Sequence, residues 1–264
     1  ADDEYDYDEG VELHDKRSSR KSEAAAARAE RSAAAASEKR ASLSEQLAEK
    51  RFNAARHLII AIGNSAYLRL QDHSPIGIGH CVIESLSHVE SLADAPEEVA
   101  AEVRNFQKCL IRMFDGRGAQ LVFFEQFLSP NASKRSMALE CIPLPARDAA
   151  AAPSCFRQEL LNSETEWAQH KKVYDTGGCV RGTVPSGFSY FDASFGLSSG
   201  VAHVIEDEAQ WPVDFGRDVL EGLMDHPSAG IPLARRPKEK FAELKKRVLD
   251  FSQAFKPFDW TQQL

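Results

Sequence analysis

The sequence predicts an α+β protein in three parts. An extended helical arm over residues 1–51 precedes an antiparallel sheet with a helix over 52–146, and a second small α+β domain follows over 147–264. Short apolar runs separated by turn residues indicate the strands, and a helical apolar repeat between them indicates the helix. A long Ala-rich stretch without an apolar face indicates the arm.

Composition bounds the class of protein. At 264 residues and 43% hydrophobic content, the chain can bury a core in one domain or two small ones. The net charge of −8 argues against a protein that coats nucleic acid by bulk electrostatics, so any RNA contact is expected to be local. Five cysteines without a close pair favour a reducing compartment.

No apolar run in the sequence is long enough to span a bilayer, and the acidic start (ADDE) is unlike a signal peptide. We therefore expect a soluble protein with no membrane partner. The abrupt start leads us to expect that the chain is part of a longer one.

The arm has two compositions. Residues 1–10 carry too much like charge to fold alone, so we expect them to be disordered without a partner. Residues 16–56 are rich in Ala, Glu, Lys and Arg, which favour helix, but they have almost no apolar face before Leu43 and Leu47. Residues 11–56 hold eleven Lys and Arg against seven Asp and Glu. A solvated helix or linker is the simpler interpretation, and a helix lying along RNA or another protein is the alternative.

Apolar runs in the first domain predict five strands with a helix between the third and the fourth. The strands are expected at residues 57–62, 66–70, 80–84, 121–124 and 137–142.

The helix is expected to begin with Asp94 as N-cap and Glu97 as its capping-box partner, and to end near residue 114. Apolar residues at spacings of four, three and four predict one buried face. That face consists of Val99, Val103, Phe106 and Leu110, whereas Glu102, Arg104 and Lys108 are expected to stay exposed.

The order of these elements, with Gly79 and His80 followed by His88, resembles the histidine-triad nucleotide hydrolases. The resemblance places the three triad positions at Ser136, Ala138 and Glu140. Alanine at the nucleophile position has no imidazole to attack phosphorus, so we expect no enzyme activity. We expect the Glu140 carboxylate to be held by a nearby arginine or lysine. The degenerate pocket would consist of His80, His88, Ser136, Ala138 and Glu140.

Ten blocks of sequence are similar to the CwfJ family of splicing factors. They are residues 56–63, 104–114 and 140–145 in the first domain, and 166–167, 171–172, 184–187, 190–191, 195–197, 202–208 and 256–260 in the second. The resemblance covers about residues 52–262, the two C-terminal modules of that family. It implies a nuclear protein of the late, intron-lariat spliceosome. Because the nucleophile position is an alanine, we expect its role there to be that of a non-catalytic scaffold. The implied partners are spliceosomal proteins, small nuclear RNAs, intron lariat RNA and the lariat debranching enzyme.

The resemblance also bears on metal. Family members often carry a Cys-x-x-Cys before the first strand, which has zinc-ligand spacing together with a histidine near His88 and the first triad histidine. Residues 44–48 contain no cysteine, and Ser136 replaces the last ligand. We therefore expect no zinc and no other cofactor, and we expect His57 and His80 to be packed or capping side chains.

In the second domain, we expect an Ala-rich link over residues 146–153, a helix over 155–174 and a final helix over 237–254. The apolar face of the final helix would be Phe241, Leu244, Val248 and Phe251. Basic side chains here are candidates for RNA phosphate contacts, although Lys171 and Lys172 at a helix end also complement the helix dipole. The candidates are Lys171, Lys172, Arg181, Arg235, Arg236 and Lys238.

A second hypothesis belongs to a different class. The chain would be a nucleotide hydrolase or nuclease of the histidine-triad type with a relocated catalytic group, for which His80, His88 and His203 are the candidates. His203 precedes an acidic run at residues 206–208, but a strand that ends in a solvated turn explains that pattern as well.

Overall fold

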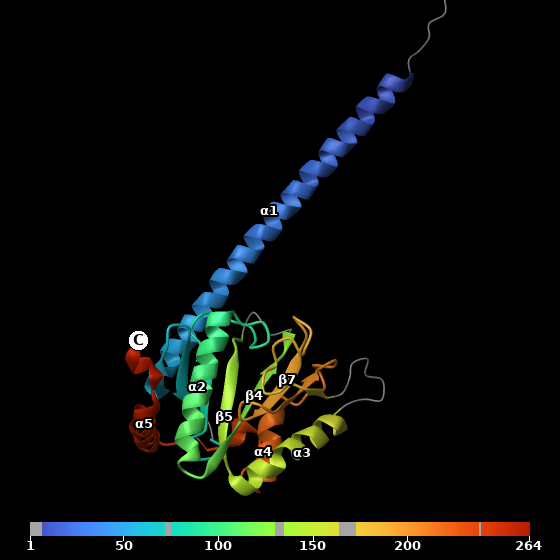
Figure 1. Cartoon of the computed structure of the whole chain (residues 1–264). Helices are drawn as coiled ribbons and strands as arrows, with labels where there is room; N and C mark the ends of the chain where they lie inside the picture. The colour runs from blue at the N-terminus through green and yellow to red at the C-terminus, as the bar shows by residue number, and fades with distance from the viewer. Residues whose placement is uncertain (1–6, 72–74, 130–134, 164–172, 238) are drawn as a thin grey trace, which may run out of the picture. The chain divides into compact units, whose positions relative to one another are not determined.

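The computed structural model describes residues 7–71, 75–129, 135–163, 173–237 and 239–264 (Figure 1). The chain divides into two units, residues 1–46 and 47–264. Helix α1 (Tyr7–Ala55) accounts for the described part of the first unit and continues into the second. The helix predicted over 16–56 is thus confirmed. Residues 7–10, expected to be disordered, also belong to α1.

Among the residues described, no helix is both long and apolar enough to cross a membrane.

The second unit is built on one eight-stranded antiparallel sheet with the order β1-β2-β3-β5-β4-β7-β8-β6. His57 and Leu58, expected to begin the first strand, belong instead to a 3-10 turn (Arg56–Leu58). The strands are β1 (Ile59–Ile62), β2 (Ala66–Leu70), β3 (Cys81–Ser85), β4 (Ala119–Phe127), β5 (Ala138–Pro145), β6 (Tyr174–Asp175), β7 (Tyr190–Phe195) and β8 (Gly200–Val204).

Strand β4 joins the two halves of the sequence. It pairs with β5 on one side and with β7 on the other, in register from Val122 opposite Phe195 to Phe127 opposite Tyr190. The boundary expected at residues 146/147 therefore lies inside one compact unit with a continuous sheet. The division into two domains stays a prediction from the sequence.

Helix α2 (Glu97–Asp115) packs on one face of the sheet, and its predicted apolar residues Val99, Val103, Phe106 and Leu110 are buried. The predicted capping box is wrong, because Pro96 is the N-cap and no side chain caps the helix. The Asp94 carboxylate instead accepts hydrogen bonds from the hydroxyls of Ser91 and Ser186 at 3.3 and 2.6 Å.

Glu102 is one of two buried polar residues among those described on α2, the other being Gln107. We expected it to be exposed, but it is 9% exposed and accepts hydrogen bonds from the backbone N–H groups of Asn64, Ser65 and Ala66 at 2.9 to 3.0 Å. A Cβ at Gly63 would lie 2.3 Å from its Oε2 atom, so that position has no room for a side chain. Glu102 therefore fixes the turn between β1 and β2.

Helices α3 (Ala146–Asn162) and α4 (Phe215–Leu223) pack on the opposite face, where Val122, Phe124, Ile142 and Leu144 point. The link expected over 146–153 is wrong, since it forms the first half of α3, as the helix propensity of alanine favours. The helix expected over 155–174 ends at Asn162, and residues 164–172 lie outside the described part of the chain.

The C-terminal segment completes the core beneath α2. Helix α5 (Phe241–Phe255) buries Phe251 and Phe255 in that core, and the segment ends in two 3-10 turns (Lys256–Phe258 and Trp260–Gln263). The Phe251 ring lies 6.3 Å from that of Phe114, between centroids. Helix α5 begins at Phe241 rather than at residue 237. The predicted burial of Phe241 is also wrong, since this side chain is 72% exposed.

We expect Phe251→Ala to lower the free energy of unfolding by about 3–5 kcal/mol, because it leaves a cavity under α2. The matched control is Phe241→Ala on the same helix, which should change it by less than about 0.5 kcal/mol. Urea unfolding followed by circular dichroism measures both. Equal effects of the two substitutions would contradict this packing.

Candidate functional site

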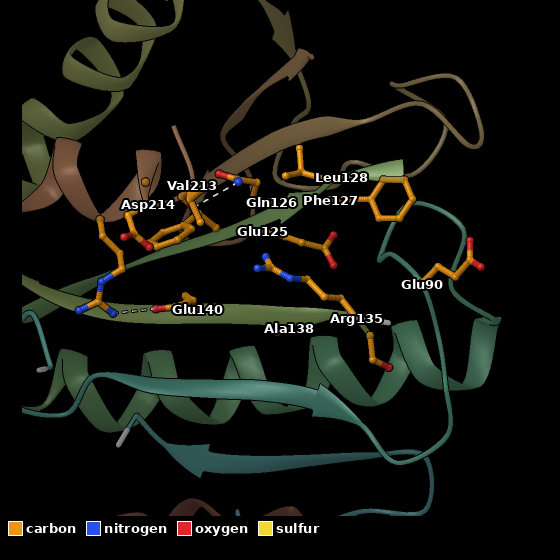
Figure 2. A pocket seen from close by; sticks show the side chains of 14 residues that line it. Glu90, Glu125, Gln126, Phe127, Leu128, Arg135, Ala138, Glu140, Val213 and Asp214 are labelled. Carbon is orange, nitrogen blue, oxygen red and sulfur yellow. Dashed lines mark hydrogen bonds and ion pairs between the residues drawn. The ribbon is translucent and has the colours of Figure 1, made fainter. Parts of the chain in front are cut away.

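The three positions expected to carry a triad line one pocket. Side chains at alternate positions of a strand share a face, so Ala138 and Glu140 of β5 lie on the same side of the sheet, and Ser136 just precedes that strand. The pocket has a volume of about 230 Å³. In Figure 2, Glu140 and Asp214 lie toward one end of it and Glu90 toward the other.

Glu140 is engaged from three sides. His80 Nε2 lies 2.6 Å from its Oε2 atom, Gln71 Nε2 donates to Oε1 at 3.2 Å, and Arg217 Nη1 is 3.6 Å from Oε2. Burial by itself would raise the pKa of Glu140, but His80 and Arg217 outweigh it and the pKa is lowered. Glu140 is thus a carboxylate, held by an arginine as expected.

His80 is a neutral structural histidine. It is fully buried, and burial lowers its pKa although Glu140 opposes that shift. Its Nδ1 atom accepts a hydrogen bond from the Ile76 N–H at 3.2 Å, so Nε2 carries the proton and its N–H donates a hydrogen bond to Glu140. Both ring nitrogens are therefore engaged within the protein.

The pocket wall offers no imidazole, since no histidine is among the described residues that line it. Ala138 presents a methyl group at the position expected for the nucleophile. His88 lies one residue before Val89, whose N–H donates to Ser136 Oγ at 3.3 Å. His203 lies on β8, stacked on Trp211 with ring centroids 5.2 Å apart.

The charges that line the pocket are mostly negative. Three carboxylates, together with Glu125, whose pKa is raised to about 7, stand against two guanidinium groups, so the pocket is unfavourable for a phosphate. The six residues are Glu90, Glu125, Glu140, Asp214, Arg135 and Arg217.

A chain of buried charges connects this pocket to the C-terminal part of the protein. Arg217 lies on α4 four residues before Glu221, with Nη2 3.9 Å from the Glu221 carboxylate. Arg236 makes two further hydrogen bonds to Glu221, at 2.5 and 2.7 Å. Sequence reasoning missed Arg217 and Glu221, although their i,i+4 spacing on an apolar helix is a usable signal.

The candidate RNA contacts have different surroundings. Arg235 is exposed at the end of the 3-10 turn Leu233–Arg235, and Arg181 forms a 2.6 Å ion pair with the exposed Glu97. The Arg236 side chain, by contrast, is engaged by Glu221 and by the Ile231 and Ser228 carbonyls, which leaves it no role at the surface. Lys171, Lys172 and Lys238 lie outside the described residues.

Two acidic residues lie side by side in the sheet. Glu125 of β4 is directly opposite Asp192 of β7, and both are buried. Glu125 accepts hydrogen bonds from the Leu92 N–H, at 3.0 and 3.1 Å, and from the Tyr190 hydroxyl. Burial raises the pKa of Glu125 to about 7 against these bonds, and burial with the Glu125 charge raises the pKa of Asp192 to about 8. Each of these acids is the only charged residue in a largely apolar strand. That pattern could have pointed to the pair from the sequence, but sequence reasoning did not use it.

Within the described ranges, no group of three or more His, Cys, Asp or Glu side chains is placed to hold a metal ion.

Two family models match the chain. The model for a protein similar to CwfJ C-terminal matches residues 47–157, and that for a protein similar to CwfJ C-terminus 2 matches residues 166–261. CWF19-like protein 2 of Danio rerio is 37% identical over 210 residues, which are 78% of this chain and 21% of that protein. Pre-mRNA-splicing factor cwf19 of Schizosaccharomyces pombe is 31% identical over 216 residues, 78% of this chain and 33% of that protein. The chain thus spans only about a fifth to a third of the length of these relatives.

Among solved structures, a hypothetical histidine triad nucleotide-binding protein from Sulfolobus tokodaii is similar over 66% of this chain and 87% of that chain. The two are 13% identical with a TM-score of 0.27, a similarity too weak to assign function or fold.

Substitutions at the adjacent residues Arg235 and Arg236 test whether the ion pair between Arg236 and Glu221 is buried. We expect Arg236→Ala to destabilise the protein by about 3–5 kcal/mol, because it leaves Glu221 buried without its bidentate partner. Arg235→Ala is the matched control and should change the free energy of unfolding by less than about 0.5 kcal/mol. Urea titration provides the comparison, and a neutral Arg236→Ala would show that the pair is not buried in solution.

The raised pKa values of Glu125 and Asp192 predict a pH dependence. Both groups hold their protons more tightly when folded, so stability should fall as pH rises from about 5 to about 8. Glu125→Gln keeps an acceptor for the Leu92 N–H but cannot ionise, so it should reduce that slope, as should Asp192→Asn. Unfolding free energies measured across this range check the sign. A wild-type slope that both variants leave unchanged would contradict the assignment.

Proposed function

Because the chain belongs to the CwfJ family, matching the models of both C-terminal segments, we propose that it acts in pre-mRNA splicing. The name of the Schizosaccharomyces pombe relative, a pre-mRNA-splicing factor, supports this role. We place the protein in the nucleus on the same basis. In the relatives, the two matched segments belong to a much longer protein. The splicing role of that longer protein is what we propose for this chain.

More specifically, the protein would be a non-catalytic scaffold of the late, intron-lariat spliceosome, linked to lariat debranching and turnover. The observation that carries the non-catalytic part is Ala138 in a pocket where Glu140 is held by His80 and Arg217. A methyl group cannot form a bond to phosphorus, and the surrounding carboxylates oppose the approach of a phosphate.

A scaffold needs surfaces for protein and RNA. Two large apolar side chains on α5, Phe241 and Leu249, are 72% and 58% exposed and are available to spliceosomal proteins. Arg181 and Arg235 are the described candidates for phosphate contacts, joined by Lys171, Lys172 and Lys238 from segments outside the description. Arg236 is left out of this set because Glu221 engages its guanidinium. The RNA partners would be the intron lariat and small nuclear RNAs, and the lariat debranching enzyme would be a protein partner.

The alternative is a nucleotide hydrolase or nuclease with a relocated catalytic group. His80, His88 and His203 were its candidates, and none of them lines the pocket. Hydrolysis of α-labelled ATP that is lost in His80→Ala would favour this alternative over the scaffold.

The splicing proposal is tested by purifying the full-length protein from nuclear extract and sequencing the bound RNA. We expect branched introns together with late-stage spliceosomal small nuclear RNAs, because a scaffold of that complex stays bound to both. Arg181→Ala with Arg235→Ala should reduce the recovered intron RNA.

The control is Lys50→Ala, which removes an exposed lysine of α1 and should leave recovery unchanged. If active extract yields neither class of RNA, the assignment to this complex is wrong. Recovery of both RNAs by a protein that also hydrolyses ATP would keep the splicing role and overturn the non-catalytic one.

A further inference from the structure

A second pocket lies on the α2 face of the sheet, opposite the face covered by α3 and α4. Its floor is formed by Leu139 of β5 and by Asp192 and Ser194 of β7. One wall is α2 and another is the loop over residues 178–181. The volume of about 370 Å³ lies within the usual size of small-ligand sites, about 300–1,000 Å³.

The floor of this pocket holds a buried polar atom without a partner. Asp192 is 3% exposed, and a side-chain hydrogen bond with Thr176 acts against the rise of its pKa. Its Oδ1 atom nevertheless has no hydrogen-bond partner among the residues that the structure describes. Such an atom costs stability unless a ligand or water satisfies it, so its presence at the floor of a pocket points to a bound group. The matching ligand is one that carries N–H donors.

The wall provides a rigid planar cation. Arg104 Nη1 donates to the Gly178 carbonyl at 3.1 Å, and Nη2 donates to the Leu197 carbonyl at 2.7 Å. Gly178 has a φ of +80°, and a Cβ there would lie 2.6 Å from the Leu197 oxygen, so the loop is closely packed where Arg104 is anchored. A guanidinium held in this way is a platform on which a nucleobase can stack.

Positive charges dominate this pocket, whereas negative charges dominate the pocket at Ala138. Arg104, Lys108 and Arg181 line it together with Glu97 and Asp192. Asp192 is largely protonated at neutral pH, because its pKa is raised to about 8. Three cations then stand against the exposed Glu97, whereas the pocket at Ala138 has more carboxylates than arginines. Phosphate groups are therefore attracted to the α2 face rather than to the triad positions.

We propose that the pocket lined by Arg104, Lys108, Arg181, Asp192 and Ser194 binds one base of a single-stranded RNA. Asp192 and Ser194 hydrogen-bond to the edge of the base, Arg104 stacks on it, and Lys108 and Arg181 contact the flanking phosphates. This inference rests on the proposed function only in taking RNA as the partner. A peptide would match the apolar part of the walls equally well, but it does not explain the three cations beside a buried acceptor.

The test uses the 264-residue chain and fluorescein-labelled oligoribonucleotides of about eight nucleotides, one for each base, in fluorescence anisotropy. Asp192→Ala should weaken binding of the preferred base about tenfold. The same variant should unfold at an equal or higher urea concentration, because it removes an unsatisfied buried carboxyl. Lys108→Ala and Arg181→Ala should weaken the binding of all four oligonucleotides. Each should also reduce the salt dependence of the affinity by the amount expected for about one phosphate contact. Lys50→Ala should change nothing.

Several outcomes would overturn the inference. Wild-type affinity that none of the three pocket variants changes would place RNA elsewhere and leave the splicing role intact. Loss of affinity in Asp192→Ala that parallels loss of folded protein would make Asp192 structural only. If no oligonucleotide binds, or if the variants abolish binding of a protein partner while RNA affinity stays the same, the pocket is not an RNA site.

Discussion

The pairing of β4 with β7 is the interaction on which the rest of the second unit depends. It joins strands from both halves of the sequence into one antiparallel sheet, so β4 is flanked on both edges and covered on both faces. Alternate residues of β4 then belong to two different cores: Phe123 packs under α2, and Phe124 packs under α3 and α4. The C-terminal helix α5 closes the core beneath α2, and the first five strands are therefore completed by residues from the end of the chain.

The same sheet places two pockets on opposite faces, and their charges separate them. On the face with α4, Ala138 presents a methyl group to the pocket, and Glu140 takes part in a chain of buried charges through Arg217, Glu221 and Arg236. These buried charges connect β5, α4 and the segment after α4. On the α2 face, cations surround a buried carboxyl instead.

Much of the first half could be predicted from the sequence. Five strands, one helix and the buried face of that helix follow from apolar periodicity, which reports local structure directly. Helix ends were less predictable: the apolar and alanine patterns did not show that Pro96 would replace Asp94 as the N-cap, or that residues 146–153 would be helical. Glu102 was misplaced because its helical position is polar by spacing, and the turn that donates three backbone N–H groups to it lies 36 to 38 residues away in the chain.

The sequence by itself determined that residues 136, 138 and 140 hold no histidine, since side-chain identity needs no coordinates. It also determined that residues 138 and 140 share one strand face, because the period of a strand is two. Only the tertiary structure decided which charges they meet. Arg235 and Arg236 are adjacent and chemically alike, yet one is exposed and the other is bound to a buried carboxylate on α4. Pairing of that kind depends on contacts between distant segments, which a local pattern of residue types does not encode.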